Sequence, residues 1–378
     1  MTNRQAEALE AIVLRVPMRD PGDLTSIEAL FDSHTIEPEE VVAIFGKTEG
    51  NGCVNDFTRA YAVDMLKVMF AQRLSCSQQN VTERIAMVMS GGTEGGLSPF
   101  FLIMGIRKNE KQGKSAAPVL AIGTAFTRNF MPEEIGRMAM VHEVEEATNR
   151  AIASAFLDSV DDVHFVQVKC PLLTSERITD AHSRHKDVIT EDTYASMGYS
   201  RGASALGVAL ALEEIDKAEI TLSSIGHDWS LFSSRASASA GVELLNCEII
   251  VLGNSNAWVG DNIIAHDVMQ DGIDSLAIWR ALAGVGFDNP PQLDNEQRDR
   301  VAAVLCKAEP GMTGVIRGAR HIMIDDSDIN ATRHARALVG GVIAGAIGGT
   351  DVFVSGGAEH QGPDGGGPVA VIAKRINA

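Results

Sequence analysis

A short pattern, Ser-x-Gly-x-Glu, occurs three times in the 378 residues of the chain. It begins at Ser90, Ser239 and Ser355, at intervals of about 130 residues, which indicates three copies of one structural unit. A lysine that closes an apolar run precedes each serine; these lysines are Lys47, Lys169 and Lys307. The fold must therefore accommodate three equivalent pairs of lysine and serine.

An arginine lies between the lysine and the serine of each unit, just ahead of a stretch of small apolar residues. The first two are Arg59 and Arg201, and the third is either Arg333 or Arg336. The charged, glycine-containing segment 108–115 marks the end of the first unit. We divide the chain into repeat units at 1–112, 113–247 and 248–378. Three sets of lysine, arginine and serine predict one site with threefold pseudosymmetry.

Apolar periodicity predicts that strands and helices alternate within each unit. In the first unit, the predicted strands span 11–16, 41–45 and 85–89, and the predicted helices span 24–31 and 59–73. The second unit is predicted to contain one long helix over 132–157, and the third to open with a strand over 248–252. The predicted fold class is α/β.

Acidic residues outnumber basic ones, and the formal net charge is −18. Because this charge repels polyphosphate and anionic lipid, we expect neither nucleic acid nor membrane as a partner. The five cysteines contain no Cys-x-x-Cys pair, which argues against a disulfide framework or a zinc-thiolate site and favours a reducing cytoplasm. We expect no targeting segment and no membrane span.

The recurring residue types indicate acyl transfer. Serine is a weak nucleophile that needs a base, and lysine can be that base if burial and nearby guanidinium groups lower its pKa. Each arginine offers a planar fork of donors to a carbonyl oxygen, and the glycine-rich turn after each serine offers amide protons to an oxyanion. We therefore expect the substrate to be a small ring rich in carbonyl groups.

The loop after Ser355 has an unusual composition. Residues 356–367 include six glycines in twelve positions. A loop of this kind exposes many backbone carbonyl groups, which are ligands suited to a hard cation such as Mg²⁺ or Ca²⁺. We expect a structural cation there and no organic cofactor.

Several longer motifs resemble one known family, the ring-opening cyclic amidohydrolases, which comprises cyanuric acid hydrolases and barbiturases. These motifs span 46–51, 90–95, 167–171, 196–201 and 355–367. The resemblance covers essentially the whole chain, and segments 51–56, 89–94 and 237–241 look more like the cyanuric acid hydrolases. It implies three pseudo-symmetric repeats in a barrel-like fold, an active site on the pseudo-threefold axis, and a homotetramer.

The resemblance also implies roles for individual residues. It assigns Lys169 as the base and Ser239 as the nucleophile, with Lys47 and Lys307 as supporting lysines. The implied substrate-binding residues are Arg59, Ser90, Gly91, Arg201, Ser239, Ala240, Arg336, Ser355 and Gly356. The implied metal ligands are Glu309, Ala358, Gln361, Gly362, Pro363 and Gly366. For the third arginine, the spacing to Ser355 favours Arg336, and Arg333 stays open.

The symmetry of the three sets favours a substrate with the same symmetry. Cyanuric acid has three equivalent carbonyl groups and three equivalent ring nitrogens, whereas barbituric acid replaces one nitrogen with carbon. We therefore expect hydrolytic ring opening of cyanuric acid to carboxybiuret, which decays to biuret and CO₂, through an acyl-enzyme. The alternatives are a barbiturase, which forms ureidomalonate, and a non-catalytic protein that binds a small threefold ring.

Overall fold

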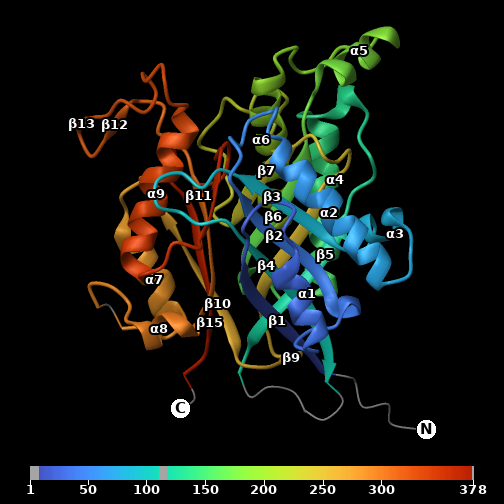
Figure 1. Ribbon diagram of the computed structural model, residues 1–378. Coiled ribbons are helices and arrows are strands. Elements are labelled where there is room, and N and C mark those ends of the chain that lie inside the picture. Colours follow the sequence, from blue (N-terminus) through green and yellow to red (C-terminus); the bar gives the residue numbers. More distant parts are fainter. Residues whose placement is uncertain (1–7, 110–116, 289, 377–378) are drawn as a thin grey trace.

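The computed structural model describes residues 8–109, 117–288 and 290–376 and shows a mixed α/β fold (Figure 1). One five-stranded and two four-stranded sheets occupy the centre, and most of the helices lie on their outer faces. The α/β class expected from the sequence is therefore confirmed. Both ends of the described chain lie at the same end of the molecule, away from the serine turns.

The first sheet is built from the N-terminal unit. Its strands are β1 (Ala8–Pro17), β2 (Val41–Thr48), β3 (Ala86–Gly91) and β4 (Phe100–Asn109). Their order is β3-β2-β4-β1, and the short strand β9 (Trp258–Val259) adds to β1. β2 and β3 run parallel, whereas β4 is antiparallel to both β2 and β1.

The second sheet follows the same plan. Its strands are β5 (Val119–Phe126), β6 (Val163–Pro171), β7 (Ala236–Gly241) and β8 (Glu248–Ser255), in the order β5-β8-β6-β7. β8 pairs with both β5 and β6, so the unit boundary that we predicted before residue 248 separates this strand from the sheet to which it belongs. A boundary after β8 keeps the four main strands of each sheet within one unit.

The third sheet repeats the order once more. Its strands are β10 (Asn262–Met269), β11 (Val301–Ala308), β14 (Phe353–Gly356) and β15 (Gly367–Lys374), in the order β10-β15-β11-β14. A small two-stranded sheet, β12 (Val315–Ile316) and β13 (Ala319–Arg320), projects beside it. In all three large sheets, the strand that carries the lysine runs parallel to the strand that carries the serine.

The strands do not close into a barrel. β3, β7 and β14, which carry the serines, are each the last strand of an open sheet, and no closed barrel forms in the part of the chain that the structure describes. The expected barrel-like arrangement therefore needs correction at the level of strand pairing. The reason is that carbonyl groups on these serine-bearing strands accept hydrogen bonds from lysine side chains of other sheets.

Helices cover the outer faces of the sheets. They are α1 (Thr25–Asp32), α2 (Phe57–Arg73), α3 (Gln78–Thr82), α4 (Met138–Ser154), α5 (Ser175–Ser183), α6 (Thr193–Ala211), α7 (Ser275–Gly284), α8 (Asn295–Arg300) and α9 (Ala331–Ile347). The long helix predicted from residue 132 is wrong in its first turn. Pro132–Glu134 is a 3₁₀ turn, and Gly136, at a φ of 72°, redirects the chain before α4 begins.

Strand alternation decides which side chains face the centre. In β2, Phe45 lies in the core shared with the other sheets, whereas Ile44 packs in the core beneath α1 and α2. Lys47 has the same parity as Phe45, and Ser90 has the same parity as Val88, which also lies in the shared core. The reactive side chains are therefore carried on the inner faces, where the three sheets meet.

All five cysteines, which lie in described segments, are free. None of the helices that the structure describes has the length and apolar character needed to cross a bilayer.

Candidate active site

The register of each sheet places a lysine directly beside a serine. Lys47 is paired with Ser90, Lys169 with Ser239, and Lys307 with Ser355. All three lysines are buried, as are the three serines. Because paired residues on neighbouring strands point to the same face, each pair is preorganised by the sheet itself.

The three pairs differ in their present contacts. Lys47 Nζ lies 3.4 Å from Ser90 Oγ, and Lys307 Nζ lies 3.2 Å from Ser355 Oγ. Lys169 Nζ instead lies 2.8 Å from Glu243 Oε1. The middle lysine therefore faces a carboxylate, while the other two face their serines.

Each lysine also donates a hydrogen bond to a strand of a sheet other than its own. Lys47 donates to the Val354 carbonyl (2.8 Å), Lys169 to the Met89 carbonyl (2.7 Å), and Lys307 to the Ala238 carbonyl (2.7 Å). Each of these carbonyls belongs to the residue immediately before a motif serine. The lysines therefore form a closed ring of contacts that joins the first sheet to the third, the second to the first, and the third to the second.

The arginines lie on α2, α6 and α9: Arg59 in the first turn of α2, Arg201 in the middle of α6, and Arg336 in the second turn of α9. Asp56, Asp192 and Asn330 cap these helices through side-chain oxygens that accept backbone N–H groups. Of the two candidates in α9, Arg336 is 3% exposed, whereas the Arg333 side chain is 45% exposed. The structure thus places Arg336 at the site and Arg333 at its rim.

Two arginines are held by motif glutamates of a neighbouring unit. Arg201 makes a two-pronged ion pair with Glu359 (2.7 and 2.6 Å), and Arg336 makes the same pair with Glu94 (2.8 and 2.5 Å). Arg59 differs, because it donates to the carbonyl groups of Ala240 and Cys53. These glutamates were assigned no role from the sequence, although their recurrence at the end of each motif was a signal that could have pointed to one.

One small cavity collects the predicted substrate-binding residues. It is lined by Gly52, Arg59, Ser90, Gly91, Met197, Arg201, Ser239, Ala240, Arg336, Ser355 and Gly356. All nine predicted residues are in this set, whereas Gly52 and Met197 were not anticipated. Both lie in segments that carry the family resemblance, 51–56 and 196–201, but neither belongs to the motif that recurs in the three units. The three lysines are not among the lining residues.

Electrostatics distinguish the three lysines. Burial, followed by the positive charge of Arg336, holds the pKa of Lys47 well below its usual range. Burial, followed by Arg201, lowers the pKa of Lys307 to about 7. Burial also lowers the pKa of Lys169, but the neighbouring Glu243 carboxylate opposes this effect. All three side chains can therefore supply a neutral amine more easily than an exposed lysine can.

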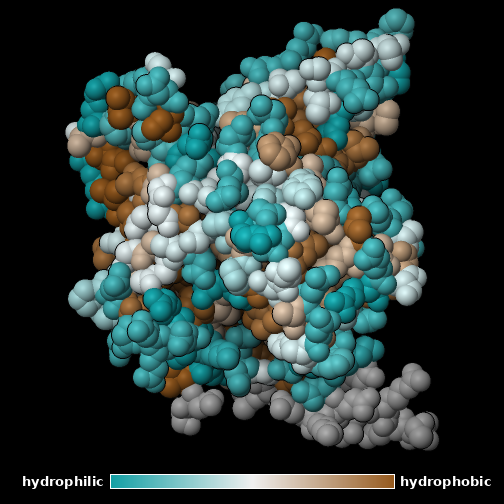
Figure 2. Space-filling view, viewed as in Figure 1, coloured by the Kyte–Doolittle hydropathy of each residue, from teal (hydrophilic) through white to brown (hydrophobic). Residues whose placement is uncertain are grey.

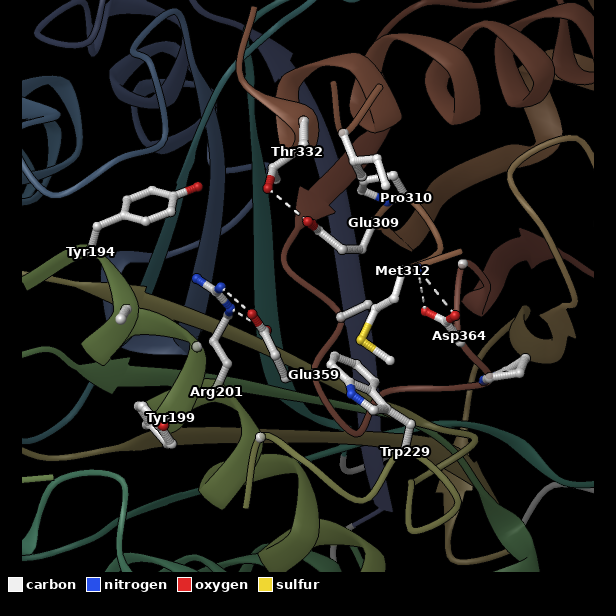
Figure 3. Close-up of a pocket in the computed structure, with 18 residues that line it drawn as sticks. Tyr194, Tyr199, Arg201, Trp229, Glu309, Pro310, Met312, Thr332, Glu359 and Asp364 are labelled. Atoms are coloured by element: carbon white, nitrogen blue, oxygen red, sulfur yellow. Dashed lines mark hydrogen bonds and ion pairs between the residues drawn. The ribbon is translucent and has the colours of Figure 1, made fainter. Parts of the chain in front are cut away.

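A second, larger pocket lies on the other side of Arg201 and contains part of the predicted metal site. Figure 3 shows Arg201 and Glu359 side by side, with Glu309, Tyr194 and Trp229 around them. Figure 2 shows the molecule hollowed between the β12–β13 segment and the upper helices, where this pocket opens. Arg201 lines both the small cavity and the larger pocket.

The predicted metal ligands are only partly gathered. Glu309, Ala358 and Pro363 line the larger pocket, whereas the Gln361 side chain turns inward and accepts the Ala238 N–H at 2.6 Å. Gly362 and Gly366 are not in the lining. In the described residues, no three His, Cys, Asp or Glu side chains form a metal-binding group. A cation would therefore depend on the Glu309 carboxylate and on backbone oxygens of the loop.

Glu309 has the chemistry that such a cation requires. Burial, followed by the charge of Glu359, raises the pKa of its carboxyl group. A cation beside two buried carboxylates would relieve their repulsion, and carboxylate and carbonyl oxygens are hard ligands. The donor set present therefore fits Mg²⁺ or Ca²⁺.

Known proteins resemble this chain along nearly its full length. The model of the amidohydrolase ring-opening protein family matches residues 12–374. A cyanuric acid amidohydrolase of Enterobacter cloacae is 54% identical over 368 residues, covering 97% of this chain and 100% of the relative. One from Pseudomonas sp. (strain ADP) is 49% identical over 362 residues, covering 96% and 98%.

Two solved structures that resemble this chain are also cyanuric acid hydrolases. A cyanuric acid hydrolase structure superposes with a TM-score of 0.93 at 48% identity, and that from A. caulinodans with a TM-score of 0.89 at 47% identity. Each comparison covers 97% of this chain and 100% of the other. The chain belongs to the ring-opening amidohydrolase family, whose members hydrolyse C–N bonds of cyclic amides.

Proposed function

We propose that the chain opens the ring of cyanuric acid by hydrolysis. The observation that carries this proposal is the single cavity in which three serines and three arginines converge, one set from each unit. The three sheets share one strand order, and the lysine contacts run cyclically between them, which supports a pseudo-threefold axis through the cavity. A ring with three equivalent carbonyl groups matches that arrangement.

The relatives support the same substrate. Those described above are cyanuric acid hydrolases that align with nearly all of this chain. Barbituric acid remains the second candidate, because two of its three sectors present the same carbonyl and nitrogen groups. A purely binding role explains less, since binding alone does not require a buried lysine beside each serine.

The proposed chemistry uses Ser239 and Lys169. Lys169 as a neutral amine takes the Ser239 proton while Oγ attacks a ring carbonyl carbon, and the amides of the following turn stabilise the oxyanion. The tetrahedral intermediate collapses as the C–N bond breaks, and the Lys169 ammonium returns its proton to the leaving ring nitrogen. Water then hydrolyses the acyl-enzyme and releases carboxybiuret, which loses CO₂ to give biuret.

The surroundings of Ser239 support its choice over the other two serines. Ala236, Ala238 and Ala240 leave more room along β7 than Val88 and Met89 leave along β3. Lys169 is next to Ser239 in the sheet register, so a change of side-chain rotamer from Glu243 brings its amine to the hydroxyl group. Lys47 and Lys307 would support the other two serines as substrate ligands.

Three further properties belong to the same proposal. A Mg²⁺ or Ca²⁺ bound by Glu309 and the loop oxygens would shape the wall of the site without touching the substrate. A homotetramer in the cytoplasm is proposed for the intact protein. Exposed apolar residues support association between copies, because Met312, Val315, Ile322, Ile324 and Ile329 gather near β12 and β13, where Figure 2 is brown.

The test is turnover of the two rings, followed through loss of their ultraviolet absorbance. We expect hydrolysis of cyanuric acid in preference to barbituric acid. Ser239→Ala and Lys169→Ala should each abolish turnover, and the double variant should be little worse than either, because the two act as a unit. Ser90→Ala and Ser355→Ala should keep measurable kcat with weaker binding. If Ser239→Ala turns over while another serine variant is inactive, the nucleophile is in another unit.

A further inference from the structure

The middle unit breaks the pattern by which motif glutamates hold arginines. Glu94 and Glu359 each grip an arginine of another unit with both carboxylate oxygens. By the same pattern, Glu243 should grip Arg59. It lies instead beside its own unit's lysine, Lys169, at 2.8 Å.

Both members of the missing pair are short of partners. Among the described residues, Arg59 Nε is buried without a hydrogen bond, and its ion pair with Asp56 is long, at 3.9 Å. Glu243 Oε1 forms an ion pair with Lys169, and neither carboxylate oxygen of Glu243 has a hydrogen-bond partner assigned to it. The Arg59 and Glu243 side chains are almost completely buried, at 2% and 4% exposed. Buried charged groups without hydrogen bonds are costly, so an arrangement that pairs them is energetically accessible.

The glycine of each motif shows where the partner arginine lies. A Cβ added at Gly357 would collide with Arg201, and one at Gly92 would meet Arg336. A Cβ added at Gly241 would meet only the Glu243 carboxylate among its three nearest atoms. At the middle turn, the Glu243 carboxylate thus occupies the place that an arginine side chain occupies at the other two turns.

The middle lysine differs from the other two in the charged group that influences it most. The first influence on Lys47 and Lys307 after burial is an arginine that lowers their pKa, whereas for Lys169 it is Glu243, which raises it. Arg59 opposes Glu243 from α2, Cys170 lies next to Lys169 on β6, and Glu248 is its register partner on β8. Arg177 is a further charged group near Glu243.

We propose that Glu243 is a positioning residue that exchanges between Lys169 and Arg59, and that it thereby makes Lys169 the lysine able to take and hold the serine proton. The inference rests on the proposed function, in which Lys169 is the base. A general base must begin as a neutral amine and then carry a positive charge, and its strength falls as its pKa falls. Among the described residues, Lys169 alone of the three lysines has a carboxylate within ion-pair distance, that of Glu243 at 2.8 Å.

The exchange leaves every proton accounted for. When Glu243 turns toward Arg59, as its two counterparts do toward their arginines, Lys169 loses the carboxylate and is favoured as the neutral amine. The Ser239 proton then passes to Lys169 Nζ, and Glu243 returns to stabilise the ammonium group. That proton passes on to the leaving ring nitrogen as the C–N bond breaks. Glu243 stays ionised throughout, consistent with the lowering of its pKa by Lys169 and Arg59 against the opposing effect of burial.

The test is the pH dependence of kcat/KM in Glu243→Gln, which keeps the shape of the side chain and removes its charge. In the free enzyme, the acid limb of this profile reports the loss of the Lys169 proton. We expect the limb to move to lower pH by about one to three units, the usual effect of removing an adjacent opposite charge. We also expect kcat at the plateau to fall by about tenfold, because the base is weaker.

The matched controls are Glu94→Gln and Glu359→Gln, which change the same motif position in the other two units. Each loosens an arginine that contacts substrate, so KM should rise while the acid limb stays at the wild-type pH. Glu243→Asp keeps the charge and should keep the limb within a few tenths of a unit, which separates the effect of charge from that of packing. Thermal melting of every variant shows which ones are folded.

Three outcomes would overturn the inference and leave the proposed function intact. They are a Glu243→Gln profile that coincides with the wild type, an acid limb that moves equally in all three Gln variants, and a limb that moves in Glu243→Asp as far as in Glu243→Gln. If Glu243→Gln does not fold, the test is made with Glu243→Asp. An acid limb and a plateau kcat close to those of the wild type support the inference, and a shifted acid limb overturns it. A folded wild-type protein that turns over neither ring would remove the proposed function, and this inference with it.

Discussion

Replacement of Lys307 by methionine should change how the stability of the protein depends on pH. Lys307 is 1% exposed, and its Nζ donates to the Ala238 and Gly356 carbonyls at 2.7 and 3.0 Å and to Ser355 Oγ at 3.2 Å. Burial lowers its pKa from 10.5 to about 7. Methionine fills a similar volume and carries no charge, so the variant isolates the contribution of the buried amine.

The direction in which stability changes with pH follows from the number of protons that the folded and unfolded states bind. Between pH 7 and pH 10.5 the unfolded lysine is protonated and the folded lysine is largely not, so the unfolded state binds more protons and stability rises with pH. The slope from this one group is about 1.4 kcal/mol per pH unit. Over the two units from pH 7.5 to 9.5, the wild type should gain about 3 kcal/mol relative to Lys307→Met.

Two effects therefore oppose one another in the variant. At high pH it lacks the hydrogen bonds of the amine, a loss on the order of 1–3 kcal/mol. At pH 7 and below it also avoids the cost of burying a group that prefers to be charged. The difference in stability between the two proteins should consequently shrink as pH falls, and the variant can become the more stable of the two.

The measurement is urea unfolding monitored by tryptophan fluorescence at several pH values. Lys217→Met serves as the control, because Lys217 is 60% exposed and pairs with Glu145 at the surface. The free energy of unfolding of Lys217→Met, plotted against pH, should run parallel to that of the wild type. If the Lys307→Met curve is also parallel to the wild type between pH 7.5 and 9.5, the folded protein holds Lys307 charged and the reasoning about buried amines is wrong.

Three other predictions follow from the site. Arg201→Lys keeps the charge but loses the planar fork that Glu359 holds, so kcat/KM should fall roughly ten- to a hundredfold, and unchanged kinetics would remove Arg201 from the site. Glu309→Ala should lower both the melting temperature and the bound Mg²⁺ or Ca²⁺ measured by elemental analysis; a metal-free wild type and an unchanged melting temperature would refute the metal site. Gly357→Ala should lower the melting temperature and raise KM, because φ is 80° and a Cβ would displace Arg201, and a wild-type value of both would contradict the described turn.

Local sequence patterns predicted much of what surrounds the site. Apolar runs located β2, β6 and β11 and the lysines they carry, because a strand buried on both faces needs little context to be recognised. The recurring motif indicated that three distant serines belong together, and the structure brings all of them to one cavity. Both signals can be recognised in a single sequence, because an apolar run is local and the recurring motif keeps the same residue types in each unit.

Other features depend on pairing that a single sequence does not display. The return strands β4, β10 and β15 were not predicted, and neither was the pairing of β8 with β5 and β6 across the predicted unit boundary, because strand partners depend on the whole sheet. The end of the recurring motif indicated three glutamates but not their partners. Two of them hold arginines and one lies beside a lysine, a difference that depends on distances between units.

The ring of lysine contacts ties catalytic competence to the integrity of the whole chain. Each lysine bonds a strand of another unit, so no unit can open without removing a lysine or an edge carbonyl from the site of its neighbour. Partial opening of one sheet should therefore be rare, and the slowest amide exchange should be shared by all three serine strands. The same coupling restricts divergence, because a substitution tolerated by one unit alone must also suit the two units that share its contacts.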